Sequence, residues 1–369
     1  MKTYSRKQTR QIQIGNVKIG GNAPVSIQSM TNTDTRDPEK SLFQIQQLAD
    51  AGCQIIRLAV PDMIAADAMQ EIAEKSPIPV IADIHFDYRL ALRSVEAGVH
   101  GIRINPGNIG SADRVRAVVE AAGNKNIPIR VGANSGSLPK GLMEEKLKQG
   151  FSHDDAMAIC LTEAVMTQIR LLEEYHFHQI KVSLKASSVP VTVAAYRHFA
   201  DRCDYPLHIG VTEAGTAWRG SIKSAMGIGS LLLDGIGDTL RVSLTSNPVE
   251  EVRTAKAILE AAGLRDALPE IVSCPTCGRT AYDMFSLIRQ VEDFVDSLKQ
   301  SGKTIRIRKL AVMGCVVNGP GEAEDAELGI AGGGENGKLV LFKSGKVFKI
   351  LPQDEAFREF QQCILEFCS

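Results

Sequence analysis

Eight short hydrophobic runs, separated by stretches with helical periodicity, dominate the pattern of this sequence. The runs are rich in Val and Ile and show little polar alternation, which is typical of strands buried on both faces. They lie at 24–30, 54–60, 79–85, 101–105, 127–132, 180–185, 206–211 and 239–244. A strand followed by a helix, repeated over about 240 residues, predicts a closed (β/α)8 TIM barrel of the α/β class.

A doubly wound open sheet is the alternative arrangement of the same elements. The count of eight strands and the lack of Gly-x-Gly-x-x-Gly after an early strand disfavour it. The segment 11–20, ahead of the first run, alternates around Gly15-Asn16 and predicts a short hairpin.

Capping residues mark the boundaries of the predicted helices. Asp37-Pro38 predicts an N-cap with proline at the first helical position, and a capping-box pattern runs from Ser152 to Asp155. Four helices end in Ala-Gly, where glycine suits the left-handed conformation that follows a last turn. These glycines are Gly52, Gly98, Gly123 and Gly263.

The regular alternation of predicted strands and helices ends at about residue 266. A Cys-Pro-Thr-Cys loop comes first, and the elements that follow are a helix near 281–299, a strand at 304–313 running into Gly314, a Gly-rich loop at 329–337, a hairpin around Ser344-Gly345 and a terminal helix. These elements predict a small α+β domain. We therefore divide the chain into a barrel domain with its hairpin, 1–265, and a cysteine-bearing domain, 266–369.

Composition excludes several classes of partner. The 369 residues carry 42 Lys and Arg against 43 Asp and Glu, a net charge of −1, which indicates neither a nucleic acid nor an anionic membrane. No apolar run approaches the roughly 20 residues that cross a bilayer, and no apolar segment of a signal peptide follows the basic start. We therefore expect a soluble, cytoplasmic protein.

Polar side chains gather at the carboxyl ends of the predicted strands, where the active site of such a barrel lies. Arginine donates two parallel hydrogen bonds to phosphate oxygens and lysine offers a point charge, so we predict a substrate with more than one phosphate. The predicted substrate-binding residues are Arg57, Arg103, Asn105, Arg130, Asn134, Lys185, Thr212, Arg241 and Ser243. Asp83, His85 and Glu213 are the catalytic candidates. Ion pairs that only stabilise the barrel are the alternative for any one of these charges.

Three cysteines lie in Gly- and Pro-rich loops of the second domain. Cys274-Pro-Thr-Cys277 is followed 38 positions later by Cys315, and Glu322 comes seven residues after that. Thiolates on tight turns suit an iron–sulfur cluster or a zinc ion. An oxygen ligand in place of a fourth sulfur would suggest an iron that can do chemistry.

The spacing favours a [4Fe–4S] cluster over its alternatives. Zinc more often has a fourth Cys or His, which Cys363 or Cys368 could supply, although a regular terminal helix argues against it. A thioredoxin-like dithiol leaves Cys315 unexplained. The five remaining cysteines are expected to be buried small hydrophobes rather than disulfides. They are Cys53, Cys160, Cys203, Cys363 and Cys368.

Over nearly its whole length the sequence resembles the family of 4-hydroxy-3-methylbut-2-en-1-yl diphosphate synthases, in its bacterial, two-domain, flavodoxin- or ferredoxin-dependent form. The motifs that carry the resemblance are Gln28-Ser-Met-Thr31, Ala82-Asp-Ile-His-Phe-Asp87, Arg103-Ile-Asn-Pro-Gly-Asn108, Val182-Ser-Leu-Lys-Ala-Ser187, Gly210-Val-Thr-Glu-Ala214, Ile236-Gly-Asp-Thr-Leu-Arg-Val-Ser243, Cys274-Pro-Thr-Cys277 and Gly314-Cys-Val-Val-Asn-Gly-Pro-Gly-Glu322. Residues 323–369 resemble the family least.

The resemblance implies the reductive ring opening and dehydration of 2-C-methyl-D-erythritol 2,4-cyclodiphosphate to (E)-4-hydroxy-3-methylbut-2-en-1-yl diphosphate, in the methylerythritol phosphate route to isoprenoids. Flavodoxin or ferredoxin would supply two electrons singly through a [4Fe–4S] cluster. The family holds its cluster with three Cys and one Glu, which match Cys274, Cys277, Cys315 and Glu322. We add Glu322 to the catalytic candidates and Asn318 to the substrate-binding ones.

Two other functions stay open from the sequence. One is a barrel lyase or aldolase with a structural zinc domain and Lys185 as a Schiff-base lysine. The other is a non-enzymatic iron–sulfur scaffold or sensor that binds a phosphometabolite.

The predicted connection between the domains bears on assembly. A helix at about 248–262 carries the chain away from the catalytic rim, and the linker of about nine residues spans at most roughly 30 Å. We therefore predict a head-to-tail homodimer in which each cysteine domain caps the partner's barrel, an arrangement that the family resemblance also implies.

Overall fold

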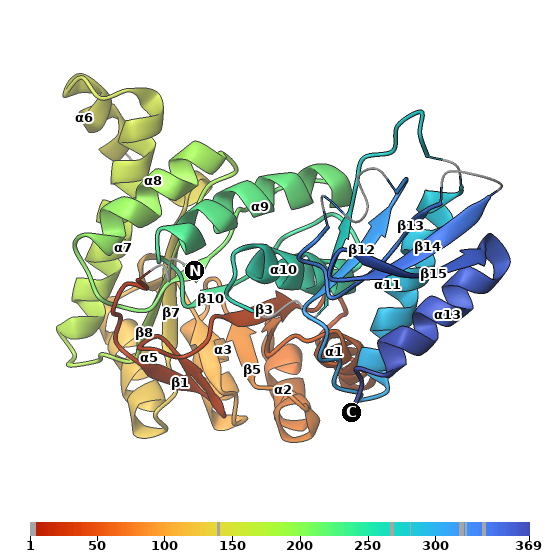
Figure 1. Ribbon diagram of the computed structural model, residues 1–369. Coiled ribbons are helices and arrows are strands. Elements are labelled where there is room, and N and C mark those ends of the chain that lie inside the picture. Colours follow the sequence, from red (N-terminus) through yellow and green to blue (C-terminus); the bar gives the residue numbers. More distant parts are fainter. Residues whose placement is uncertain are drawn as a thin grey trace. The chain divides into compact units, whose positions relative to one another are not determined.

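The structure is a computed structural model that describes residues 5–138, 141–265, 269–280, 282–316, 321, 323–333 and 337–369. The chain divides into two compact units, Met1–Arg265 and Asp266–Ser369. Figure 1 shows the elements of both units in chain order. Among the described residues, no helix combines the length and the apolar character needed to cross a membrane.

The first unit is a (β/α)8 barrel, which confirms the predicted fold. Its parallel strands pair in the order β8-β7-β6-β5-β4-β3-β10-β9, and a parallel bridge between Val182 and Leu207 joins the two ends of this ring. The strands are β3 Ser26–Met30, β4 Ile55–Ala59, β5 Val80–Asp83, β6 Gly101–Arg103, β7 Ile129–Asn134, β8 Ile180–Lys185, β9 His208–Ile209 and β10 Thr239–Leu240.

Helices alternate with these strands and surround them (Figure 1). They are α1 Pro38–Asp50, α2 Met63–Lys75, α3 Tyr88–Glu96, α4 Pro106–Ile109, α5 Ala112–Asn124, α6 Leu142–Lys148, α7 His153–Glu173, α8 Val189–Ala200, α9 Ala217–Leu233 and α10 Pro248–Ala261, with a 3-10 turn at Ser135–Ser137. Asp37 and Ser152 cap α1 and α7 as predicted, each accepting a backbone N–H from the first turn.

Three of the four predicted C-terminal glycines adopt the left-handed conformation, with φ of 105° at Gly52, 84° at Gly98 and 67° at Gly263. The prediction for Gly123 was wrong because α5 continues through Asn124. Asn126, with φ of 54°, takes the left-handed position after this helix instead. Asparagine tolerates that conformation better than most residues with a side chain.

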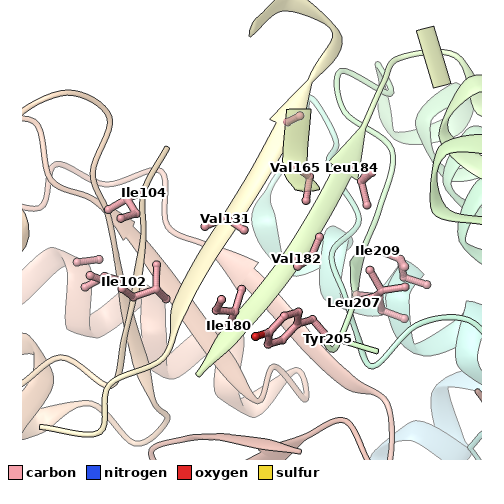
Figure 2. Packing of buried hydrophobic residues seen from close by; sticks show 14 of the residues in the cluster. Ile102, Ile104, Val131, Val165, Ile180, Val182, Leu184, Tyr205, Leu207 and Ile209 are labelled. Atoms are coloured by element: carbon pink, nitrogen blue, oxygen red, sulfur yellow. The ribbon is translucent and has the colours of Figure 1, made fainter. Parts of the chain in front are cut away.

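The strands alternate in a way that the sequence analysis missed. Their outward side chains are apolar and pack in the main core; Figure 2 shows Val131, Ile180, Val182, Leu184, Leu207 and Ile209 among them. The residues between, such as Lys181, Ser183 and Lys185, are buried as well but polar, because alternate side chains face the inside of the closed ring. The predicted burial of the strands on both faces is confirmed, but the face inside the ring is largely polar. Most TIM barrels fill this space with branched apolar side chains.

The predicted hairpin forms and packs against the amino-terminal end of the barrel. Strands β1 Ile12–Ile14 and β2 Val17–Ile19 pair antiparallel around Gly15, whose φ is 56°. Their isoleucines form one small apolar cluster with Ile55 and Ile81, which begin the inward-facing rows of β4 and β5. The hairpin therefore covers the amino-terminal ends of β4 and β5 with apolar side chains.

The second unit is an α+β domain built on one five-stranded sheet. The strands follow in the order β11 Glu270–Ser273, β12 Lys309–Met313, β13 Leu328–Gly332, β14 Lys338–Lys343 and β15 Lys346–Pro352, the first three parallel and the last two antiparallel. Helices α11 Met284–Gln300 and α13 Gln353–Leu365 contribute Leu287, Val291 and Phe360 to its apolar core.

Two predictions for this unit were wrong. Residues 329–332 of the expected Gly-rich loop belong to β13 in the middle of the sheet, while 334–336 lie outside the described residues. A Cβ at Gly329 would lie 2.1 Å from the ring of Phe342, so glycine is needed for that ring to pack. The predicted strand 304–313 begins only at Lys309, and β11 was missed. The hairpin at Ser344-Gly345 is confirmed, with φ of 46° and 72°.

Candidate functional site

The five predicted cations of the barrel all lie on or just after its strands. We call Arg57, Arg103, Arg130, Lys185 and Arg241 the cation cluster. Strand pairing sets Arg103 beside Arg130, and Asn134 beside Lys185. Three members are almost fully buried, with exposed fractions of 7% for Arg57, 6% for Arg130 and 9% for Lys185. The fold thus brings these charges into the barrel interior.

Burial and mutual repulsion lower the pKa values of three members of the cluster, Arg57, Arg130 and Lys185. Burial lowers the pKa of Arg57 to about 10, and Arg241 and Arg103 add to this effect although Asp83 opposes it. The pKa values of Arg130 and Lys185 fall well below their ordinary range, first through burial and then through neighbouring cations. A bound anion would relieve this repulsion and favour the charged forms.

Several hydrogen-bond donors inside the barrel have no partner among the described residues. They include Nε and Nη1 of Arg130, Nε of Arg241 and Nε2 of Gln28. A buried donor without a partner is costly, by about 1–3 kcal/mol, and more when it is charged. The interior is therefore suited to a ligand with several anionic oxygens.

Asp83 lies against the cation cluster at the end of β5. Its carboxylate is 3.0 Å from Nη1 of Arg103 and 3.4 Å from Nε of Arg57. Burial alone would raise the pKa of Asp83, but the facing guanidinium groups outweigh it and hold the pKa at about 2. An acid of this kind is ionised at neutral pH and orients arginines, rather than donating a proton.

His85 lies two residues beyond Asp83 at the rim, with its side chain 56% exposed. Nη1 of Arg103 is 3.1 Å from Nε2 and 3.2 Å from Nδ1 of the His85 ring. Burial first, and then Arg103, lower the pKa of His85, while Asp83 opposes them. These effects favour the neutral imidazole, in which one ring nitrogen can accept a hydrogen bond.

The remaining predicted residues of the barrel lie at or just beyond the carboxyl ends of its strands. Asn105 caps α4, its Oδ1 accepting the N–H of Gly107 at 3.1 Å. Asn134 is the last residue of β7, and Thr212 and Ser243 are half-buried beyond β9 and β10. Glu213 is exposed and has a φ of 51°. Asn318 and Glu322 lie outside the described residues.

Sequence reasoning missed three buried groups near the cluster. Lys181 is 1% exposed and donates to Oε1 of Gln28 at 3.2 Å, and burial lowers its pKa well below the usual range. His208 is fully buried, and its pKa is lowered in the same way. Glu251 lies 3.4 Å from Nη2 of Arg241. The two-residue period of Lys181, Ser183 and Lys185 was the signal that could have revealed the first.

The three candidate ligand cysteines of the second unit, Cys274, Cys277 and Cys315, lie in loops that follow two neighbouring strands. Cys274 follows β11, and Cys315 comes two residues after its parallel neighbour β12. The N–H of Gly314 donates to Sγ of Cys274 over 3.2 Å, which ties the two loops together. Cys277 is exposed, and hydrogen bonds from the backbone and then the side chain of Arg279 lower its pKa.

This donor set fits an iron–sulfur cluster in its chemistry. All eight cysteines of the chain are free thiols, as expected for the five outside the loops, although Cys203 and Cys368 are only half-buried. The N–H···S bond at Cys274 and the lowered pKa of Cys277 favour thiolates. Within the part of the chain that the structure describes, no three His, Cys, Asp or Glu side chains are grouped closely enough to hold a metal ion.

Comparison with known proteins points to the same family in both units of the chain. The family model described as the GcpE TIM-barrel domain matches residues 9–256, and the GcpE protein C-terminal domain matches residues 270–366. Proteins named 4-hydroxy-3-methylbut-2-en-1-yl diphosphate synthase (flavodoxin) are among its relatives. The one from Clostridium perfringens is 51% identical over 98% of this chain and 99% of its own length. Those from Geobacter sulfurreducens and Caldanaerobacter subterraneus are 53% and 52% identical, over 94% and 96% of both chains.

Proposed function

Because this chain belongs to the GcpE family, we propose that it catalyses the reductive ring opening and dehydration of 2-C-methyl-D-erythritol 2,4-cyclodiphosphate to (E)-4-hydroxy-3-methylbut-2-en-1-yl diphosphate. The observation that carries the proposal is the cation cluster, buried inside the barrel with donors of Arg130 and Arg241 that have no partner among the described residues. A cyclic diphosphate supplies the anionic oxygens that such donors need.

The barrel residues bind and orient the substrate. The cation cluster, with Asn134, Thr212 and Ser243 at the same rim, would hold the two phosphates, and Asn105 and Asn318 would complete the set. Asp83 keeps Arg57 and Arg103 in place through its ion pairs. His85 and Glu213 at the rim are the groups that could hold or move a proton at the reacting end of the substrate.

The cysteine loops would hold the cofactor. In this proposal Cys274, Cys277, Cys315 and Glu322 bind a [4Fe–4S] cluster, which supplies single low-potential electrons and an iron that is open to a substrate atom. A carboxylate is a harder and more labile ligand than a thiolate, so Glu322 would leave that iron accessible. Flavodoxin, named in the relatives, or ferredoxin would deliver the two electrons in the cytoplasm.

Family membership favours this activity over the two alternatives. The pKa of Lys185 is lowered in the manner of a Schiff-base lysine, but burial among cations accounts for that shift equally well. Anaerobic preparation should give about four iron and four sulfide per chain, and turnover of the cyclic diphosphate should require a low-potential donor. Zinc in place of iron, or borohydride trapping of Lys185, would contradict the proposal.

We also propose that the chain forms a homodimer. Helices α9 and α10 carry an apolar surface groove, in which Trp218 is 77% and Met226 is 61% exposed. Exposed apolar patches of this kind mark interaction sites. In a head-to-tail dimer each cysteine domain would cap the partner's barrel, so a mixture of Cys315→Ser and Arg103→Met chains should regain activity. A fully active monomer in sedimentation would refute the dimer.

A further inference from the structure

Glu251 is a carboxylate in an unusual place for an acid. It lies in the first turn of α10, on the face that also buries Pro248, Val252 and Ala255. Its exposed fraction is 4%. A buried carboxylate is unfavourable unless it is paired and hydrogen-bonded. The contacts of Glu251 therefore indicate its role.

These contacts join three segments of the barrel at Arg241. Oε2 of Glu251 accepts from Oγ of Ser29 on β3 at 3.2 Å, and Oε1 accepts from the N–H of Leu244 after β10 at 3.0 Å. Nη2 of Arg241 lies 3.4 Å from both oxygens. Glu251 is therefore fixed by two neutral donors and faces the guanidinium with its whole carboxylate.

The rest of the Arg241 guanidinium remains available to a ligand. Nη1 is 3.8 Å from Sδ of Met30, a weak acceptor. Nε is buried and has no hydrogen-bond partner among the described residues. A carboxylate that holds one nitrogen of a long, flexible side chain fixes the direction in which the others point.

We propose that Glu251 is a positioning residue that holds Arg241 in the orientation that binds the diphosphate of the substrate. This inference rests on the proposed function, and it extends the site beyond the strand ends to a helix. It gives Arg241 the kind of support that Asp83 gives to Arg57 and Arg103. Glu251 itself does not touch the substrate in this proposal.

The test uses Glu251→Gln in the iron-loaded protein. Glutamine keeps the size of the side chain and one oxygen for Leu244, but it places a donor where Arg241 needs an acceptor. Anaerobic calorimetry without reductant, with the cyclic diphosphate and in parallel with inorganic pyrophosphate, should show affinity reduced between about 10- and 100-fold. KM should rise in the same proportion, with kcat within about threefold.

Controls separate positioning from stability. Glu250→Gln changes the neighbouring acid, which pairs at the surface with Arg253 at 2.8 Å, and should leave affinity unchanged. Arg241→Met should lower affinity at least as much as Glu251→Gln, and the double variant no further, because both remove the same contact. If Glu251→Gln does not fold, Glu251→Asp and Ser29→Ala provide milder versions of the same disturbance.

Two results would overturn the inference. One is a lowered melting temperature with unchanged affinity, because that is the outcome of a purely structural pair. The other is additive losses in the double variant. If the wild-type protein binds pyrophosphate but not the cyclic diphosphate, and Glu251→Gln weakens that binding, the proposed substrate fails while the role of Glu251 stands.

Discussion

The two units of this chain hold their chemical groups in opposite places. In the barrel, charged side chains lie inside, on the strands themselves, and Arg130 and Lys181 are almost fully buried. In the second unit the sheet interior is apolar, and Cys274, Cys277 and Cys315 lie in loops beyond the strand ends. The barrel site is therefore built into the middle of the fold at the expense of stability, whereas the thiols lie in loops at the margin of a core against which Cys274 packs.

Loop cysteines should give the largest effect. Cys274→Ser, Cys277→Ser or Cys315→Ser should each abolish turnover and most bound iron, because irons of such clusters need thiolates. The iron-free variants should melt within a few degrees of the iron-free parent, because serine differs from cysteine by a single side-chain atom. Iron content, activity and thermal melts measure this. Full iron and activity in any one variant would remove that cysteine from the ligand set.

Replacing a buried cation of the barrel should weaken ligand binding but stabilise the ligand-free fold. Arg130→Met should weaken diphosphate binding by about 1.5–3 kcal/mol, the value of a hydrogen bond to a charged group. It should also raise the free energy of unfolding of the ligand-free protein by on the order of 1 kcal/mol, because a buried, repelled cation is removed.

Denaturant unfolding and KM measurements test this, with the exposed pair variant Arg116→Met as control. A destabilised Arg130→Met protein would show that this arginine supports the barrel rather than straining it.

Much of the fold could be predicted because its signals are local. Eight Val- and Ile-rich runs, the cap at Asp37 and the Ser344-Gly345 turn all depend on neighbours in the sequence. Gly329 was misread because it packs against Phe342, a residue on the next strand. Its meaning depends on a contact that only the folded sheet makes.

The candidate site was predictable mainly at the ends of the strands, although Arg130, the second residue of β7, was also predicted. Arg57 and Asp83 follow from the rule that TIM barrel sites lie there. Lys181 and His208 lie nearer the amino-terminal ends of their strands, where TIM barrels usually carry branched apolar side chains, and Glu251 comes from a helix. Recognising them requires knowing which side chains face one another across the closed barrel.

Acid titration tests how much the paired carboxylate of Asp83 contributes to the stability of the barrel. Its pKa is about 2 in the folded chain and about 3.9 when unfolded, so the folded value is depressed. Its contribution, on the order of 2 kcal/mol, is therefore fully present above about pH 4 and is lost as the pH falls toward 2.

Asp83→Asn should lack this part of the acid dependence, as measured by urea unfolding between pH 5 and pH 2, a window set by the same two pKa values. Glu120→Gln, at an exposed pair with Arg116, should retain it. An unchanged pH profile in Asp83→Asn would mean that Asp83 is not clamped by Arg57 and Arg103.

Substitution of cysteines outside the loops should have the smallest effect on activity and iron content. These variants test whether the position of a cysteine, rather than its residue type, defines the thiol site. Cys160 on α7 and Cys363 on α13 are buried within helices. Cys160→Ala and Cys363→Ala should leave turnover and iron content unchanged and should alter the free energy of unfolding by about 1 kcal/mol or less. In the native iron-free protein, iodoacetamide should label Cys277, which is exposed and has a lowered pKa. It should spare Cys53, because burial raises the pKa of that thiol to about 11. Loss of iron from Cys363→Ala would instead bring the terminal helix into the metal site and remove the contrast between loop thiols and packing thiols.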